Sequence, residues 1–171
     1  MTGLKPFLAP EWAPHAALWA GWPRHAEEWG GDLTAARADI AAFIHAAARH
    51  EKVKVAIGSD EAMASALAAI GGAAQLVRIP TGDIWLRDTG PIVTGAGASR
   101  AAQVFRFNGW GGKYLMDGDT DTAAAMAGIE QLPARARDFV LEGGGIDVDG
   151  EGRLLTTRQC LLNPNRNPAL N

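Results

Sequence analysis

The sequence predicts an α/β fold built from a repeated strand–helix–strand unit. Three observations favour it: short apolar runs alternate as strands do, helical periodicity appears between them, and the same order of elements returns about fifty residues later. Such a repeat is typical of architectures in which one unit cannot bury its own faces and its neighbours complete the core. The chain offers about three such units at most.

Residues 1–31 are predicted to form an extended arm. They hold four of the six tryptophans, with prolines spaced between them. Proline breaks helices, so we expect one short strand over residues 17–22 and indole rings packed on the body of the domain.

Residues 32–171 carry the repeated units. In the first repeat we expect a helix capped by Asp32 and running to Arg49, a strand over 53–57, a helix opened by Ser59 or Asp60 and closed by Gly71-Gly72, a strand over 75–79, a loop, and a strand starting at Gly90. In the second we expect a strand over 103–107, a glycine-rich loop over 108–113, a helix from Asp119 or Thr120 to about Glu130, a strand over 139–141, and a hairpin of 146–148 with 153–157.

The composition is that of one globular domain. The chain has 171 residues, 47% apolar and 20% charged, with a formal net charge of −3. Its basic residues are scattered, which argues against a nucleic-acid partner. The single cysteine excludes an internal disulfide, and no apolar run is long enough to span a membrane. We therefore expect a soluble, cytoplasmic protein.

The segment Asp83–Pro91 is the hardest part of the chain to explain as packing. It places Trp85, Arg87 and the carboxylates of Asp83 and Asp88 between two predicted strands. Loops held by a rigid sheet concentrate binding groups, and a carboxylate beside an indole suits a flat organic cation. Asp88 could therefore face a substrate. It could equally tie two loops through an ion pair with Arg87, Lys113 or Arg106.

Glu142 occupies the matching place in the second repeat. A pseudo-symmetric arrangement would aim Asp88 and Glu142 at one channel, where two carboxylates could clamp a guanidinium by charge-assisted hydrogen bonds. Alternatively, Glu142 simply marks a turn before Gly143-Gly144-Gly145.

Other chemistries are poorly supported. The glycine-rich stretches lack the spacing of phosphate-binding loops. The four histidines show no metal-ligand spacing with one another or with Cys160, so no metal site is predicted. Cys160 ends an apolar run that reads as a strand, with no histidine near it in sequence, and is expected to be buried and inert.

Six motifs in order resemble those of agmatine deiminases, which group with bacterial-type peptidylarginine deiminases. They are Glu11-Trp12-Ala13-Pro14-His15, Trp22-Pro23, Trp85-Leu86-Arg87-Asp88-Thr89-Gly90-Pro91, Phe107-Asn108-Gly109-Trp110-Gly111-Gly112-Lys113, Glu142-Gly143-Gly144-Gly145-Ile146, and Leu154-Leu155-Thr156-Thr157 leading into Asn165-Arg166-Asn167-Pro168. The W-x-R-D-x-G-P and N-R-N-P elements are the most specific.

The resemblance implies a pentein-type α/β propeller, with repeated ββαβ-like units around a pseudo-fivefold axis. It implies hydrolysis of a small cationic guanidine, without cofactor, through a covalent cysteine intermediate. Asp88 would be the first guanidinium-binding carboxylate, Glu142 the glutamate of the E-G-G motif, and Trp85 and Trp110 walls of the pocket.

One departure limits this carry-over. In the family the catalytic histidine and cysteine follow the N-R-N-P element, where this sequence stops. Cys160 matches a different family cysteine, and Asp147 stands where many relatives carry histidine. We therefore expect residues 1–171 to be the N-terminal part of a single catalytic domain, about half of the ring, inactive alone. It would form a homo-oligomer or pair with a complementing C-terminal half.

Two other functions stay open. The chain could be a non-catalytic pentein-type module that binds a partner or a guanidinium ligand. It could also belong to a peptidylarginine deiminase or an amidinotransferase, which differ from the first reading in substrate.

Overall fold

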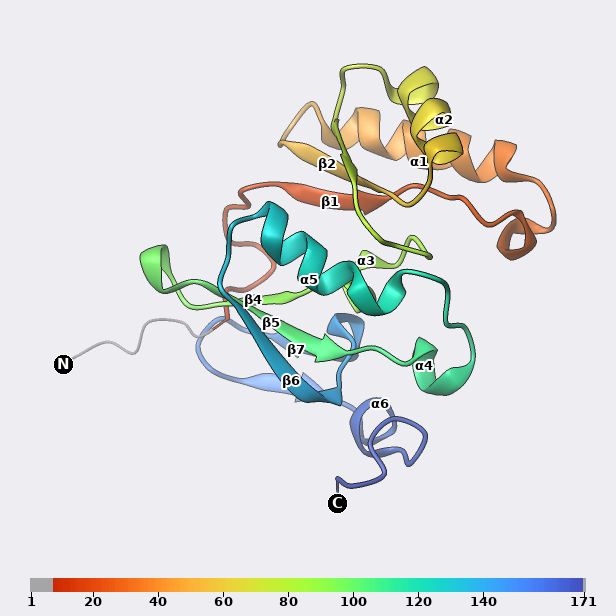
Figure 1. Cartoon of the computed structure of the whole chain (residues 1–171). Helices are drawn as coiled ribbons and strands as arrows, with labels where there is room; N and C mark the ends of the chain where they lie inside the picture. The colour runs from red at the N-terminus through yellow and green to blue at the C-terminus, as the bar shows by residue number, and fades with distance from the viewer. Residues whose placement is uncertain (1–7, 171) are drawn as a thin grey trace. The chain divides into compact units, whose positions relative to one another are not determined.

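Three short sheets organise the computed structural model, which describes residues 8–170 (Figure 1). The chain divides into two compact units. The amino-terminal unit comprises Pro14–Leu86 and Met116–Asp119, and the carboxy-terminal unit comprises residues 8–13, Arg87–Leu115 and 120–170. The first seven residues of the predicted arm lie outside the described residues.

The amino-terminal unit is a parallel sheet with helices. Its elements are β1 (Leu18–Gly21), η1 (Ala26–Trp29), α1 (Leu33–Ala47), β2 (Val53–Ile57), α2 (Asp60–Ile70) and β3 (Gln75–Arg78). The strand order is β1-β2-β3, so β2 is central and every residue of β2 is buried. This confirms the predicted elements and adds a single 3₁₀ turn within the arm.

The two long helices begin where the sequence predicts. The Asp32 side chain accepts a hydrogen bond from the amide of Thr34 before α1, and the Ser59 side chain accepts one from the amide of Ala62 at the start of α2. These caps satisfy helix N–H groups that have no partner within the helix. The helices then pack their apolar faces against β2.

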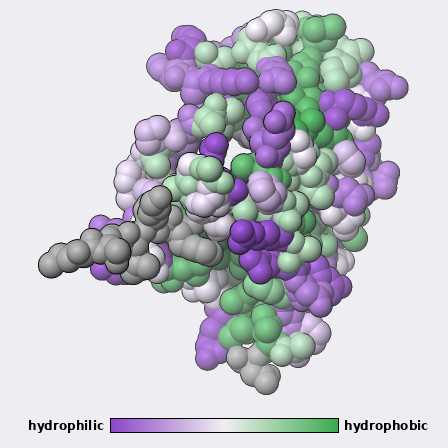
Figure 2. Space-filling view, turned by 60° about the vertical axis from the view of Figure 1, so that its left-hand side comes forward, coloured by the Kyte–Doolittle hydropathy of each residue, from purple (hydrophilic) through white to green (hydrophobic). Residues whose placement is uncertain are grey.

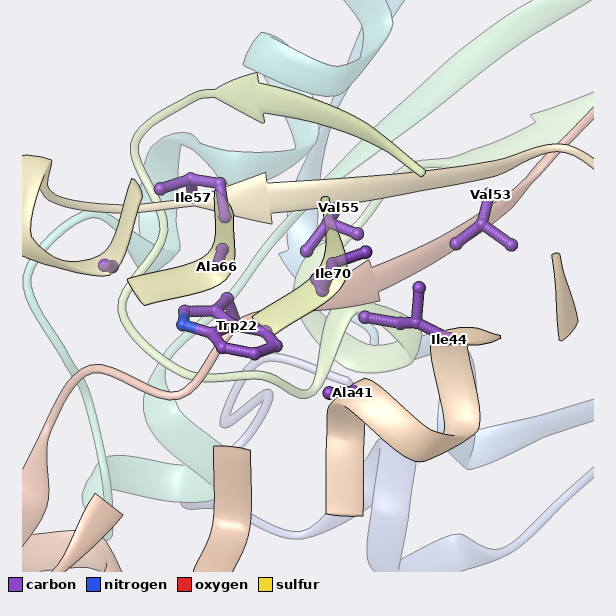
Figure 3. Packing of buried hydrophobic residues seen from close by; sticks show 9 residues of the cluster. Trp22, Ala41, Ile44, Val53, Val55, Ile57, Ala66 and Ile70 are labelled. Atoms are coloured by element: carbon purple, nitrogen blue, oxygen red, sulfur yellow. The ribbon is translucent and has the colours of Figure 1, made fainter. Parts of the chain in front are cut away.

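Figure 3 shows the core between β2 and these helices, gathered around Trp22, Ile44 and Val55. The side chains of Ile44 and Val55 are fully buried and Trp22 is 2% exposed. The Trp22 indole N–H donates to Ser65 Oγ at 2.9 Å, so its one polar group is satisfied. Trp22, one of the four tryptophans of the predicted arm, is thus a central core residue.

A buried carboxylate completes this unit. Asp119 is 1% exposed, and its Oδ1 accepts hydrogen bonds from the amides of Gly82 at 2.9 Å and Asp83 at 3.0 Å. Its Oδ2 accepts from the amide of Met116 at 3.1 Å. The start of the 83–91 segment is therefore fixed by a residue far along the chain.

The carboxy-terminal unit contains a ββαβ arrangement followed by a hairpin. Its main elements are β4 (Ile92–Thr94), β5 (Ala101–Arg106), α5 (Asp119–Ile129, from Thr120 on within this unit), β6 (Ala134–Val140), β7 (Ile146–Val148) and β8 (Leu154–Thr156). β5 pairs antiparallel with β4 and parallel with β6, and β7 pairs antiparallel with β8. The predicted hairpin is confirmed, and β6 begins five residues earlier than the expected strand, at Ala134.

Several segments predicted as loops or strand are single helical turns. They are α3 (Leu86–Thr89), η2 (Gly97–Ser99), α4 (Gly109–Gly112), η3 (Gly143–Gly145) and α6 (Arg158–Leu162). The prediction of a strand running to Cys160 is wrong, because Thr157 caps α6 by accepting a hydrogen bond from the amide of Cys160.

The surface mixes polar and apolar groups. Figure 2 shows hydrophilic residues over much of the face drawn, with hydrophobic residues exposed between them. The most exposed large apolar side chains of the carboxy-terminal unit are Trp12 and Leu155, at 76% and 73%. No helix in residues 8–170 combines the length and apolar character that crossing a bilayer requires.

Candidate functional site

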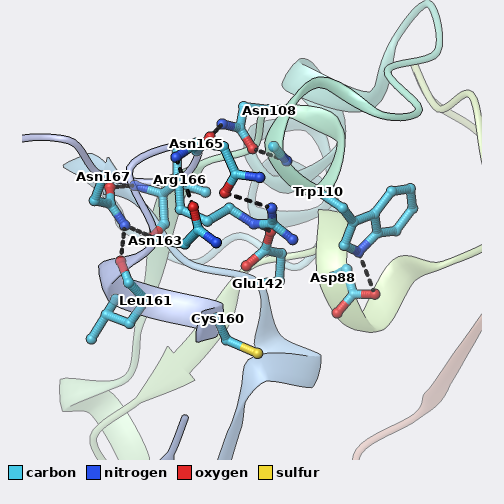
Figure 4. A network of polar contacts seen from close by, with 12 residues as sticks. Asp88, Asn108, Trp110, Glu142, Cys160, Leu161, Asn163, Asn165, Arg166 and Asn167 are labelled. Atoms are coloured by element: carbon cyan, nitrogen blue, oxygen red, sulfur yellow. Dashed lines mark hydrogen bonds and ion pairs between the residues drawn. The ribbon is translucent and has the colours of Figure 1, made fainter. Parts of the chain in front are cut away.

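Asp88 lies in the single turn α3, with its carboxylate held at both oxygens. Oδ1 accepts a hydrogen bond from the amide of Gly144 at 2.9 Å. Oδ2 accepts one from the indole N–H of Trp110 at 3.3 Å, as Figure 4 shows. A carboxylate offers about four acceptor positions, so both oxygens can accept further donors. The two bonds therefore orient the carboxylate without saturating it.

The alternative in which Asp88 merely ties two loops through an ion pair is wrong. Arg87 pairs with Glu11 instead, and this bond raises the pKa of Arg87. Arg106 pairs with Asp138 at 3.3 Å. Within residues 8–170, Asp88 forms no ion pair.

Trp110 reaches Asp88 from an unusual backbone conformation. Its φ is 55° and ψ 43°, a left-handed geometry that is uncommon for residues other than glycine. Asn108 stabilises the turn, because its Oδ1 accepts from the amide of Gly111 at 2.9 Å. The Trp110 ring packs edge-to-face on Phe107, with centroids 5.0 Å apart.

Glu142 is a buried carboxylate with a cationic partner. It is 4% exposed, and its Oε1 accepts from Arg166 Nε at 2.7 Å. The alternative in which Glu142 only marks a turn is therefore insufficient, because a buried ionised carboxylate needs such a partner. The pair joins the E-G-G motif to the N-R-N-P motif.

The glycines after Glu142 let Asp88 approach the backbone. A Cβ at Gly144 would collide with Asp88 Oδ1, and one at Gly143 would collide with the carbonyl oxygen of Arg87. Only glycine leaves room for this approach. The glycine run thus connects the two carboxylate motifs directly.

Trp85 and Asp147 are the two remaining residues that the sequence singles out. Trp85 is 54% exposed and belongs to the amino-terminal unit. Asp147 is exposed, and its Oδ1 accepts from the amide of Val148 at 2.8 Å. The structure therefore brings together Asp88, Trp110 and the Glu142 segment of the predicted set.

Cys160 is a free thiol beside Gly145. It is partly buried, so the expectation of a fully buried cysteine is wrong. All four histidines belong to the amino-terminal unit. In the part of the chain that the structure describes, no group of three His, Cys, Asp or Glu side chains could hold a metal ion.

Sequence reasoning missed the asparagines that brace the site. Asn167 is 6% exposed; its Oδ1 accepts from the amide of Val140 at 2.8 Å, and its Nδ2 donates to the Val140 carbonyl at 2.8 Å. Asn108 Nδ2 donates to the carbonyl of Asn165 at 2.9 Å. The available signal was the density of asparagines in 163–167, since these side chains readily bond to backbone groups.

This arrangement suits recognition of a planar cation. Asp88 and Glu142 supply negative charge, and Trp110 supplies an aromatic ring beside Asp88. A guanidinium presents several N–H donors in one plane, which carboxylates accept in fixed directions.

The chain belongs to the Porphyromonas-type peptidyl-arginine deiminase family, whose model matches residues 7–171. Among curated relatives, an agmatine deiminase of Stutzerimonas stutzeri is 39% identical over 96% of this chain and 46% of its own length. An agmatine deiminase of Ectopseudomonas mendocina is also 39% identical, over 95% of this chain and 46% of its own length. The chain thus spans about half the length of the curated relatives it matches.

Solved structures agree with this assignment. Agmatine deiminase of Enterococcus faecalis matches with a TM-score of 0.89 and 27% identity, over all of this chain and 50% of that one. A C. jejuni agmatine deiminase with substrate bound matches with a TM-score of 0.85 and 29% identity, over 96% of this chain and 49% of that one. The fold is therefore α/β, as the sequence pattern predicts, and part of a pentein-type propeller, as the family resemblance implies.

Proposed function

We propose that this chain supplies the guanidinium-binding part of a guanidine hydrolase that converts agmatine to N-carbamoylputrescine and ammonia. The similarity to agmatine deiminases and the negative charge of the Asp88 and Glu142 carboxylates support this assignment. Residues 1–171 would be the N-terminal part of a single pentein catalytic domain. The single cysteine and the absence of any disulfide suit a reducing cytoplasm, where we place the reaction.

The reaction needs groups that this chain does not supply. A cysteine thiolate would attack the guanidinium carbon, ammonia would leave after protonation by a histidine, and water would release the ureido product from the thiouronium intermediate. We place that cysteine and histidine in a complementing C-terminal half. Asp88 and Glu142 would hold the guanidinium nitrogens during both steps, with Trp85 and Trp110 as walls.

The held carboxylate of Asp88 carries the proposal. Its two hydrogen bonds come from an amide and an indole, and Asp88 forms no ion pair among residues 8–170. A preoriented anionic group of this kind favours a cationic ligand, because little ordering is needed on binding.

Calorimetric titration of the purified 171-residue chain with agmatine tests this proposal. We expect saturable binding of agmatine and much weaker binding of putrescine, which lacks the guanidinium. Asp88→Asn should weaken agmatine binding by about tenfold or more, because it removes a charge-assisted hydrogen bond. No N-carbamoylputrescine should form.

Asp39→Asn is the matched control, since Asp39 is exposed on α1 in the amino-terminal unit. It should leave agmatine binding unchanged. Equal loss in both variants, or turnover that survives extensive purification, would overturn the proposal.

A peptidyl-arginine substrate is a second candidate, favoured by the description of the matching family model. A peptide ending in arginine, titrated beside agmatine and free arginine, separates the two. Tighter binding of the peptide would favour the peptidyl-arginine reading. Binding without any turnover after addition of a complementing half would favour a non-catalytic module.

A further inference from the structure

Arg166 makes the only ion pair that Glu142 forms within residues 8–170. The contact is a single hydrogen bond from Nε to Oε1 at 2.7 Å, with side chains 14% and 5% exposed. Removing one partner of such a buried pair leaves the other charge uncompensated, which is strongly unfavourable. Arg166 is thus the cationic partner that orients the Glu142 carboxylate inside the unit.

The pair leaves half of the carboxylate available. Arg166 bonds to Oε1, and no donor to Oε2 is found among the described residues. A carboxylate held at one oxygen keeps a defined direction, while its second oxygen can accept from a ligand. The geometry therefore resembles that of Asp88, which is also held without being saturated.

The same guanidinium touches the turn that carries Trp110. Arg166 Nη1 donates to Asn165 Oδ1 at 3.3 Å, and a Cβ at Gly111 would collide with Arg166 Nη1. Asn108 closes the same turn by bonding to Gly111 and to Asn165. Trp110 keeps its left-handed backbone because this packing surrounds it.

We propose that Arg166 is a positioning residue for both halves of the guanidinium site. It orients Glu142 through Oε1, and it braces the 108–113 turn that brings Trp110 to Asp88 (Figure 4). This inference rests on the proposed function, because its purpose is to hold a guanidinium. Arg166 itself stays outside contact with the ligand.

A double-mutant cycle on agmatine affinity tests the first contact. Arg166→Gln should weaken agmatine binding by about tenfold, and it should have little further effect once Glu142→Gln is present. Arg166→Lys should recover part of the lost affinity, since lysine restores the positive charge but not the planar set of N–H donors of the guanidinium. Tighter binding by Arg166→Gln would mean that Arg166 competes with the ligand for Glu142, and would overturn the proposal, as would additive losses.

The second contact is tested without ligand. In a ¹H–¹⁵N spectrum the Trp110 indole N–H signal, assigned with Trp110→Phe, should move in Arg166→Gln and Arg166→Lys. It should not move in Arg135→Gln, a control at an exposed arginine of β6. An unmoved signal in both Arg166 variants overturns the proposal even if agmatine does not bind, whereas failure of the unmodified chain to bind agmatine counts against the proposed function.

Should Arg166→Gln fail to fold by circular dichroism, the cycle is run with Arg166→Lys in its place. Coupling between Arg166→Lys and Glu142→Gln supports the positioning role. Independent effects overturn it.

Discussion

Asn167 illustrates how one side chain can substitute for a sheet neighbour. Its amide bonds to both backbone groups of Val140 and, through Nδ2, to the Leu161 carbonyl at 2.9 Å. It therefore ties the end of β6, next to Glu142, to α6. Buried backbone groups left without partners are costly, so this position should tolerate little change.

Asn167→Ala should lower the free energy of unfolding by about 2–4 kcal/mol, because it leaves the backbone groups of Val140 and Leu161 without these hydrogen-bond partners. Urea denaturation measures the change. Asn163→Ala is the control: within residues 8–170 its exposed side chain accepts a hydrogen bond only from the amide of Asn165, and the cost should stay below about 1 kcal/mol. Equal costs would contradict the assigned role of Asn167.

Glu28 should make stability depend on pH. Burial raises the pKa of Glu28 from 4.5 to about 7, and the charges of Asp83, Asp119 and Glu27 add to the effect against an opposing Arg24. Between about pH 4.5 and pH 7, the folded state therefore keeps a proton on Glu28 that the unfolded state has lost. The resulting stabilisation is complete below about pH 4.5 and is lost as the pH rises through 7.

Glu28→Gln removes the ionisation and should raise the melting temperature relative to the unmodified chain at pH 8, with a much smaller difference at pH 5. Thermal unfolding followed by circular dichroism at both pH values measures it. Asp39→Asn should give the same small difference at both. A Glu28→Gln effect independent of pH would rule the explanation out.

At the scale of elements, the 108–113 turn combines two separate demands on glycine. Gly111 and Gly112 both have left-handed φ values, of 85° and 81°. A Cβ at Gly111 would meet Arg166 and Asn165, whereas a Cβ at Gly112 would meet nothing within 4 Å. Substituting Gly112 therefore tests backbone strain alone, whereas substituting Gly111 tests backbone strain together with steric crowding.

Gly112→Ala should destabilise the chain by about 1 kcal/mol through the φ cost alone. Gly111→Ala should cost about 2–3 kcal/mol, because crowding is added, and it should also shift the Trp110 indole signal. Urea denaturation and the indole spectrum measure both. Equal costs would show that Arg166 and Asn165 yield freely and do not brace the turn.

Elements with local signals could be predicted from the sequence, and the contacts between them could not. The helices after Asp32 and Ser59 follow from caps and periodicity. The turn α6 was missed because the apolar residues of 154–162 resemble a strand. Asp88 and Glu142 stand out locally, but the Arg166 contact spans 24 residues, and the bond to Asp88 depends on a left-handed Trp110.

At the scale of the whole molecule, β8 leaves an apolar edge. It has one strand neighbour, β7, among the described residues, and Leu154 and Leu155 are 55% and 73% exposed. An unpaired strand edge with apolar side chains favours pairing with another chain. We therefore propose that this edge supports self-association or docking of further chain segments.

Sedimentation velocity should show association that increases with protein concentration. Leu155→Glu should suppress it, because a charge on an edge strand opposes pairing. Leu67→Glu, at a position 60% exposed on α2, should leave it unchanged. A chain that stays monomeric throughout, or equal behaviour of the two variants, would contradict this expectation.

The hydrogen bonds to Asp119 also determine when, during synthesis, the loop at Gly82 and Asp83 can reach its final conformation. Domains generally fold during synthesis as their residues become available. The amides of Gly82 and Asp83 donate to Asp119, which is synthesised 37 residues after Gly82 and 36 residues after Asp83. During that interval the strands of the parallel sheet can already form. The loop after β3 cannot form its hydrogen bonds to Asp119 until β4 and β5 have been synthesised.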